Sequence, residues 1–219
     1  MKGFRPPADD FAHRSRTPAA AHAYSELRRR ILYGELPGAT LLNEVETAEA
    51  LGMSRTPVRE ALRELLRDGL IEEGPRRQAV VTTTSPELNR EVSLMRAALE
   101  GLTAREAAQS TPTEEFDQLH LITIRARRAL LAEDVNAFLD TDDEFHLCIA
   151  HIARLPIVED TIRRLRGYTR LRGLEQPWTL DQLHQAVEEH EAIIDALVKH
   201  DPDAAEEALT AHIRVAATA

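Results

Sequence analysis

The sequence predicts a mainly α-helical protein in two parts: a front domain of three helices and a small β-hairpin, then an all-α helical bundle. Three observations support this prediction. Aromatic residues make up only 4% of the chain, while Ala, Leu and Arg abound, which favours helices with aliphatic cores. A strongly amphipathic segment covers residues 54–67. Beyond residue 85, long helix-favouring segments are separated by breaks that contain proline.

Charge divides the chain in the same way. The net charge is −10, an unusual value for a nucleic-acid-binding protein. Residues 1–84 carry 13 Lys/Arg and 12 Asp/Glu, a net of +1, whereas residues 85–219 carry 14 and 25, a net of −11. Because a phosphate backbone repels an acidic surface, we expect any DNA binding to lie in the front part.

Three absences in the sequence indicate a cytoplasmic protein. Cys148 is the single cysteine, so no internal disulfide is expected. The sequence contains no apolar run of about 18 residues that could span a membrane, and its N-terminus lacks the apolar segment of a signal peptide. We therefore expect no membrane partner.

The front domain is predicted over residues 19–84, after a flexible arm at residues 1–18. The arm is either a disordered tail or a segment that touches DNA through its arginines. A first helix is expected over 19–34, ended by Gly34, with its buried face formed by Tyr24, Leu27, Ile31 and Leu32. Leu41-Leu42 leads into a second helix at about 44–51, which Asn43 caps and Gly52 ends.

The third predicted helix has two distinct faces. Its apolar face contains Val58, Ala61, Leu62, Leu65 and Leu66. A second stripe contains Arg55, Arg59, Arg63 and Arg67. Ser54 or Thr56 can cap the helix, and Pro57 is tolerated in its first turn.

Such a helix end can enter a major groove, with Ser54, Arg55, Thr56 and Arg59 as the predicted DNA-binding residues. The alternative is a solvated helix in which Glu60 and Glu64 only pair with arginines.

A β-hairpin is predicted after Gly69. Its strands are Leu70-Ile71 and residues 79–82, and its loop runs from Glu72 to Gln78. Arg76 and Arg77, near the tip, could reach a minor groove. Three helices with a basic hairpin form a winged helix-turn-helix with a small β-hairpin wing.

These segments resemble the N-terminal domain of GntR-type bacterial regulators. The similar segments are residues 27–34, Pro37-Gly38, residues 51–62 and Asp68-Gly-Leu-Ile, of which Ser-Arg-Thr-Pro-Val-Arg-Glu-Ala-Leu is the most specific. The resemblance implies that Arg55, Thr56 and Arg59 face an operator. The chain departs from the family at three positions: Val45 replaces a frequent DNA-contacting Arg, Thr47 a usually apolar residue and Gln78 a common wing glycine.

The second domain, residues 85–219, is predicted to contain helices throughout. We expect them near 86–109, 113–132, 134–153, 156–174, 180–200 and 202–217, with breaks at the Pro-containing junctions. Such helices can enclose a cavity.

Four residues of this domain can form a metal site: Asp142, His146, His190 and His212. Asp142 and His146 are four residues apart and share a helix face. One carboxylate and three imidazoles can bind a divalent ion such as Zn, Ni, Mn or Co. The alternative is that the histidines are surface or buried hydrogen-bonded residues.

The same region resembles the FCD effector domain of the FadR branch. The similar segments are Asp142-Asp-Glu-Phe-His146, residues 189–197, Ala208-Leu-Thr-Ala-His212 and Arg96-Ala-Ala-Leu-Glu100. The resemblance implies a metal on the Asp and three His, which helps to bind a small carboxylate. Arg96 could bind that carboxylate, or it could pair with Glu100.

We therefore expect a ligand-responsive transcriptional regulator, a repressor, that binds double-stranded operator DNA as a homodimer and responds to an organic acid. The rival hypothesis is a metal-dependent hydrolase or lyase with Glu189 or Glu191 as base. Neither glutamate shares the helix face of His190, which counts against it. A third possibility is a helical interaction module with structural histidines.

Overall fold

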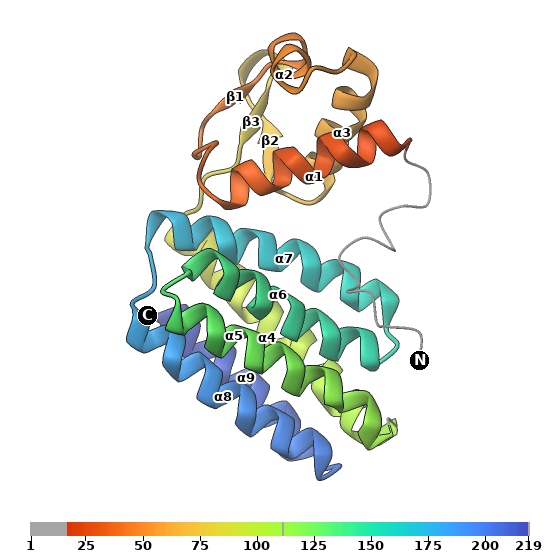
Figure 1. Cartoon of the computed structure of the whole chain (residues 1–219), viewed down its shortest axis with the longest axis vertical. Helices are drawn as coiled ribbons and strands as arrows, with labels where there is room; N and C mark the ends of the chain where they lie inside the picture. The colour runs from red at the N-terminus through yellow and green to blue at the C-terminus, as the bar shows by residue number, and fades with distance from the viewer. Residues whose placement is uncertain (1–16, 111, 219) are drawn as a thin grey trace. The chain divides into compact units, whose positions relative to one another are not determined.

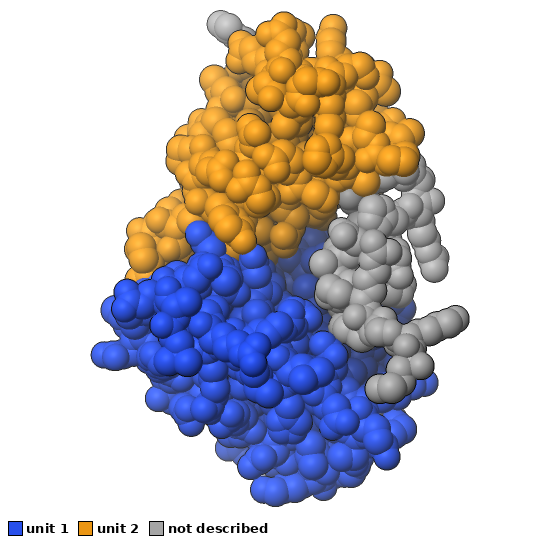
Figure 2. Space-filling view, in the orientation of Figure 1, with its two compact units in different colours: residues 1–8, 86–166, 178–219 blue, residues 9–85, 167–177 orange. Residues whose placement is uncertain are grey.

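The computed structural model describes residues 17–110 and 112–218. These residues form two compact units, coloured separately in Figure 2. Residues 17–85 and 167–177 form the front unit; residues 86–166 and 178–218 form the second. Residues 1–16 of the predicted arm lie outside the described residues.

The front unit has the predicted winged helix-turn-helix fold (Figure 1). Its elements are α1 (Pro18–Leu32), β1 (Leu41–Leu42), α2 (Glu44–Leu51), α3 (Arg55–Arg67), β2 (Ile71–Glu73) and β3 (Ala79–Val81). The antiparallel sheet has the order β1-β3-β2, and a 3-10 turn at Pro75–Arg77 joins β2 to β3. The core includes Leu27 and Ile31 of α1 and Val58 and Leu65 of α3.

Local signals end these helices where the sequence predicts. The side chain of Asn43 accepts a hydrogen bond from Val45 N (2.8 Å) and caps α2. Gly52 and Gly69 take left-handed φ values of 63° and 72° after α2 and α3, a conformation that suits glycine.

Two details differ from the prediction. Strand β1 was not predicted, because two residues are too few to show alternation; Leu41 and Leu42 pair with Val80 and Ala79 of β3. Leu66 was placed on the apolar face of α3, but it is 39% exposed. It lines a cleft together with Leu62 of the same helix.

The second unit is an all-α bundle, as predicted. Its helices are α4 (Pro86–Ser110), α5 (Asp117–Leu131), α6 (Val135–Ile152), α7 (Pro156–Glu175, shared with the front unit), α8 (Leu180–Val198) and α9 (Pro202–Thr218). Thr113–Phe116 forms a 3-10 turn at the start of the predicted 113–132 helix. Helix α9 packs on α4 and α8, and α5 packs on α6 and α8. Figure 1 shows these long helices running alongside one another.

The predicted domain boundaries stay a prediction, and the compact units differ from them at one place. The front unit ends one residue after the predicted boundary, at Ser85. However, residues 167–177 were assigned to the second domain, whereas they pack with the front unit, since Leu171 enters its core. No helix of the described chain is both long and apolar enough to cross a membrane.

Candidate DNA-binding surface and metal site

The N-terminal end of α3 presents the predicted DNA-binding side chains to solvent. Ser54, Arg55, Thr56 and Arg59 are exposed, while Pro57 and Val58 beside them are buried. Ser54 stands at the N-cap position, but its side chain makes no capping hydrogen bond, and neither does that of Thr56 in the first turn. The first backbone N–H groups of α3 are therefore left without a side-chain cap, which suits a helix end that meets an anion.

The arginines of α3 differ in their partners. Arg55 Nη2 lies 3.5 Å from Glu44 Oε2, and Arg67 Nη2 lies 3.6 Å from Glu64 Oε2. No ion pair to another described residue is found for Arg59 or Arg63. Of the two pairs in the alternative interpretation, Glu64–Arg67 is formed and Glu60–Arg63 is not, so the middle of the stripe is available to an external anion.

A cleft of about 520 Å³ extends from α3 to the wing. Its basic lining residues are Arg55, Arg59, Arg63 and Arg77. Val45 also lines it and is 43% exposed. Glu44, Glu72 and Glu73 line the same cleft, so its charge is mixed. Arg77 comes from the wing turn; the side chain of Arg76 lies outside the described part of the molecule.

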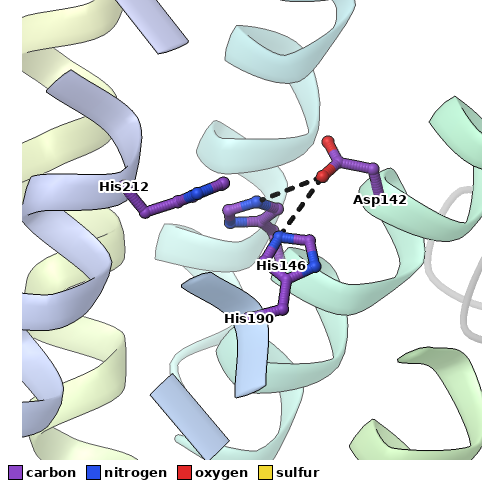
Figure 3. Close-up of side chains that lie close together, drawn as sticks. All are labelled: Asp142, His146, His190 and His212. Carbon is purple, nitrogen blue, oxygen red and sulfur yellow. Dashed lines mark ion pairs between the residues drawn. The ribbon is translucent and has the colours of Figure 1, made fainter. Parts of the chain in front are cut away.

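In the second unit, α6, α8 and α9 bring the four predicted metal ligands together (Figure 3). One ligand atom from each of Asp142, His146, His190 and His212 lies within 4.8 Å of the others. Asp142 Oδ1 is 3.4 Å from His190 Nε2 and 3.8 Å from His146 Nε2. The three histidines are buried, so the cluster is a compact interior site.

The surroundings of the imidazoles set their orientation. His146 Nδ1 lies 2.5 Å from Glu100 Oε2, and His212 Nδ1 lies 2.7 Å from Glu189 Oε2. A proton on His212 Nδ1, which is hydrogen-bonded to Glu189, leaves the Nε2 lone pair of His212 free to bind a metal. His146 Nδ1 lies close to Glu100 but has no hydrogen-bond partner among the described residues. The ring of His190 stacks on Phe145 with centroids 3.9 Å apart. These contacts hold three rings in a ligand-like arrangement.

Electrostatics favour the protonation states that a metal needs. Burial lowers the pKa of His190 to about 3, with the neighbouring His212 acting in the same direction. Burial and Arg166 keep the pKa of His146 well below its usual value. Burial alone would raise the pKa of Asp142, but the positive charge of Arg166 holds it far below the ordinary range. Neutral imidazoles beside an ionised carboxylate are the forms that bind cations.

The donor set fits a divalent metal. His146 Nε2 and His190 Nε2 are buried and have no hydrogen-bond partner among the described residues. A buried polar atom without a partner is costly, and a cation at the centre would satisfy both nitrogens together with Asp142. Three imidazoles and one carboxylate suit Zn, Ni, Mn or Co without selecting one of them.

Arg96 is buried and occupied by an internal partner. Its Nε donates to Glu100 Oε1 at 2.6 Å, and its Nη2 lies 3.4 Å from Glu100 Oε2. The structure therefore contains the ion-pair arrangement that the sequence left as one of two alternatives. Because Glu100 also faces His146, Arg96 belongs to the support of the cluster.

The residues that sequence reasoning missed are those that support the ligands. Arg166, on α7, pairs with Asp142 and donates from Nε to Asp143 Oδ1 at 2.6 Å. Glu189 was considered only as a base for the rival enzyme, and Glu100 only as a partner of Arg96. No sequence spacing connects these residues with the ligands they contact, because each contact joins two different helices.

A winged helix-turn-helix front unit with an all-α second unit defines a class of bacterial transcriptional regulators. The sequence matches the bacterial regulatory proteins of the gntR family over residues 19–81 and the FCD domain over residues 91–215. The chain belongs to the GntR family and carries an FCD domain.

Relatives of known function are regulators of transcription. The chain is 32% identical to the HTH-type transcriptional repressor RspR of Escherichia coli K12 over 203 residues, 90% of this chain and 86% of that protein. It is 27% identical to the galactonate operon transcriptional repressor of the same strain, over 83% of this chain and 88% of that protein. These relatives give no support to the hydrolase or lyase hypothesis.

Solved structures show the same fold. E. coli McbR/YncC matches with a TM-score of 0.79 and 22% identity, covering 91% of this chain and 95% of that one. A GntR regulator from Rhodococcus sp. RHA1 matches with a TM-score of 0.79 and 20% identity, covering 92% and 97%.

Proposed function

We propose that this regulator is a homodimeric repressor that binds a two-fold related operator and releases it in response to a small organic acid. The N-terminal end of α3 enters the major groove, and the wing arginine Arg77 reaches the neighbouring minor groove. The observation that carries the DNA-binding half of the proposal is the exposed surface of Ser54, Arg55, Thr56 and Arg59.

The effector half of the proposal is based on the buried cluster. A divalent ion held by Asp142, His146, His190 and His212 supplies a positive centre that attracts a carboxylate. Its charge is balanced only in part by Asp142, since Arg166 already neutralises that carboxylate. An anionic ligand would complete the balance of charge. Arg96 supports the site through Glu100 and is not needed as a direct contact.

Substitution of the recognition arginines tests the DNA-binding half. We expect Arg55→Ala or Arg59→Ala to weaken specific operator binding by about 1–3 kcal/mol each, because an arginine contact to guanine is lost. Gel shifts on an operator obtained by mapping bound genomic DNA measure the change. Arg67→Ala is the matched control, since Arg67 lies at the far end of α3 beside Glu64. Unchanged operator affinity in both test variants would contradict the placement of α3 in the DNA interface.

Metal analysis tests the effector half. We expect one divalent ion per chain in the purified protein and its loss in His190→Ala, which removes a buried ligand. His184→Ala is the matched control, because His184 lies on the same helix and is exposed. Elemental analysis of both variants measures the effect. Equal metal content in the two variants would show that the ion, if bound, lies elsewhere.

A further inference from the structure

Two consecutive residues of α8 face different parts of the cluster. His190 contributes a ligand atom directly. Glu189, the residue before it, lies about 100° around the helix from His190. Its Oε2 accepts a hydrogen bond from His212 Nδ1 of α9 at 2.7 Å. Because α8 and α9 pack on one another within the second unit, α8 supplies one ligand and also holds the ligand of its neighbour.

The carboxylate of Glu189 is itself held on its other side. Gln185, one turn earlier on α8, donates from Nε2 to Glu189 Oε1 at 3.0 Å. Each carboxylate oxygen therefore has its own partner, and rotation of the carboxylate would break one of the two bonds. The side chain of Glu189 is 21% exposed and that of His212 is 6% exposed. Glu189 thus connects an exposed glutamine to a buried imidazole.

The bond to Glu189 determines which nitrogen of His212 is free. An ionised carboxylate can only accept a hydrogen bond, so Nδ1 carries the proton and Nε2 keeps its lone pair. The ring of His212 lies with its centroid 5.1 Å from that of His146 and 4.8 Å from that of His190. Figure 3 shows this ring extending from its helix toward the other three side chains. The hydrogen bond therefore fixes His212 in the form and direction of a metal ligand.

The other two imidazoles are held by an aromatic ring. Phe145 stacks on His190 with centroids 3.9 Å apart, and it meets His146 edge to face at 5.6 Å. The Nε2 atoms of both histidines have no hydrogen-bond partner among the described residues. His212 differs from them because its orientation depends on a hydrogen bond to a carboxylate, and that carboxylate is Glu189.

We propose that Glu189 is a positioning residue for the metal, which keeps His212 in the tautomer and orientation that bind a divalent ion. The proposal rests on the metal site of the proposed function. A carboxylate that is hydrogen-bonded to a ligating imidazole typically changes metal affinity by about 10- to 100-fold. Leu209 and Ile213 anchor α9 in the core on either side of His212. The backbone at His212 is therefore held without Glu189, and the role of Glu189 concerns the imidazole ring.

Zinc titration of the full-length, metal-free protein against a chromophoric chelator tests this role. We expect Glu189→Ala to weaken zinc binding by about 10- to 100-fold. Glu189→Gln keeps an amide oxygen that can accept from Nδ1, so its loss should be smaller. Gln185→Ala should also give a small loss, since the bond to His212 remains. Glu188→Ala is the matched control, because Glu188 is the preceding residue, is exposed and pairs with Arg127; its zinc affinity should be unchanged.

Nitrogen-15 NMR of the histidine side chains in metal-free protein gives a second readout. With the signals of His212 assigned from His212→Ala, we expect the wild type to carry the proton on Nδ1. In Glu189→Ala the proton should be shared with Nε2, because no acceptor then fixes it on Nδ1. Glu189→Gln should restore the wild-type tautomer. A residue with a merely structural role would not change this equilibrium.

The outcomes separate the two proposals. A wild type that binds no zinc would overturn the metal site and, with it, the role of Glu189. Equal zinc affinity in Glu189→Ala and Glu188→Ala, or a proton that stays on Nδ1 in Glu189→Ala, would overturn only the positioning role. Should Glu189→Ala fail to fold, wild-type zinc affinity in both Glu189→Gln and Gln185→Ala would overturn that role as well.

Discussion

The two candidate sites differ in the exposure and pairing of their charged side chains. On α3, Arg59 and Arg63 are exposed and no ion pair holds them within the described chain, whereas Arg166 of the second unit is buried and paired with Asp142, whose side chain is 16% exposed. An exposed charged side chain stays hydrated until a binding partner displaces the water. A buried charged side chain must be compensated by an opposite charge within the fold. The exposed arginines of the front unit are therefore available to bind an external polyanion. The charged side chains of the second site are already held in place by partners within the fold. Substitutions should accordingly affect binding in the front unit and stability as well as binding in the second.

The largest difference is expected for Asp142→Asn. Loss of this charge leaves Arg166 buried with only Asp143 as its anionic partner, so the free energy of unfolding should fall by about 3 kcal/mol in metal-free protein. Urea denaturation measures the change. The control is Glu115→Gln, which breaks the exposed ion pair with Arg154 and should cost less than about 1 kcal/mol. Equal costs in the two variants would contradict the contrast between the sites.

A smaller effect is expected for Val45→Arg in the front unit. The added guanidinium lies in the cleft that also contains Arg55 and Arg59 and should gain a DNA contact, which raises affinity by about 1 kcal/mol and steepens the salt dependence by about one phosphate contact. Operator titrations at several salt concentrations measure both. Unfolding should be unchanged, because Val45 is substantially exposed. If the salt slope stays the same and affinity does not rise, Val45 lies outside the interface.

A further comparison uses a chemical probe that leaves both sites intact. Burial raises the pKa of the Cys148 thiol to about 12, so the reactive thiolate is scarce at pH 8. We expect Cys148 to react with a disulfide reagent at least about a hundredfold more slowly in folded protein than in urea. A cysteine introduced by Thr56→Cys on exposed α3 should react rapidly in the same Cys148-containing protein. Comparable rates for both thiols would contradict the burial assigned to the second unit.

The same contrast explains where sequence reasoning succeeded. Helix ends were predictable at Asn43, Gly52 and Gly69, because capping and left-handed turns depend on local residues. The stripe of arginines on α3 was also predictable, since spacing along one helix fixes its faces. Strand β1 was missed because its pairing with β3, not its own pattern, defines it.

The metal-type cluster was predictable only in part from local spacing in the sequence. Asp142 and His146 are related by helical spacing, whereas His190 and His212 were grouped with them by residue type, a weak pattern that the family resemblance strengthened. Their supports, Glu100, Glu189 and Arg166, each belong to a different helix from the ligand they contact. Such contacts depend on how helices pack, which local patterns do not encode.

By itself, the sequence determined the helical fold class, the helix boundaries and the exposed arginine stripe, because each follows from interactions within a few residues of one another. Only the tertiary structure decided that the end of α7 belongs to the front unit, that Arg96 is held by Glu100, and that Arg166 holds Asp142. Except for the Arg96–Glu100 pair, which lies within one helix, these features join segments tens of residues apart, and only side-chain packing between helices brings them into contact.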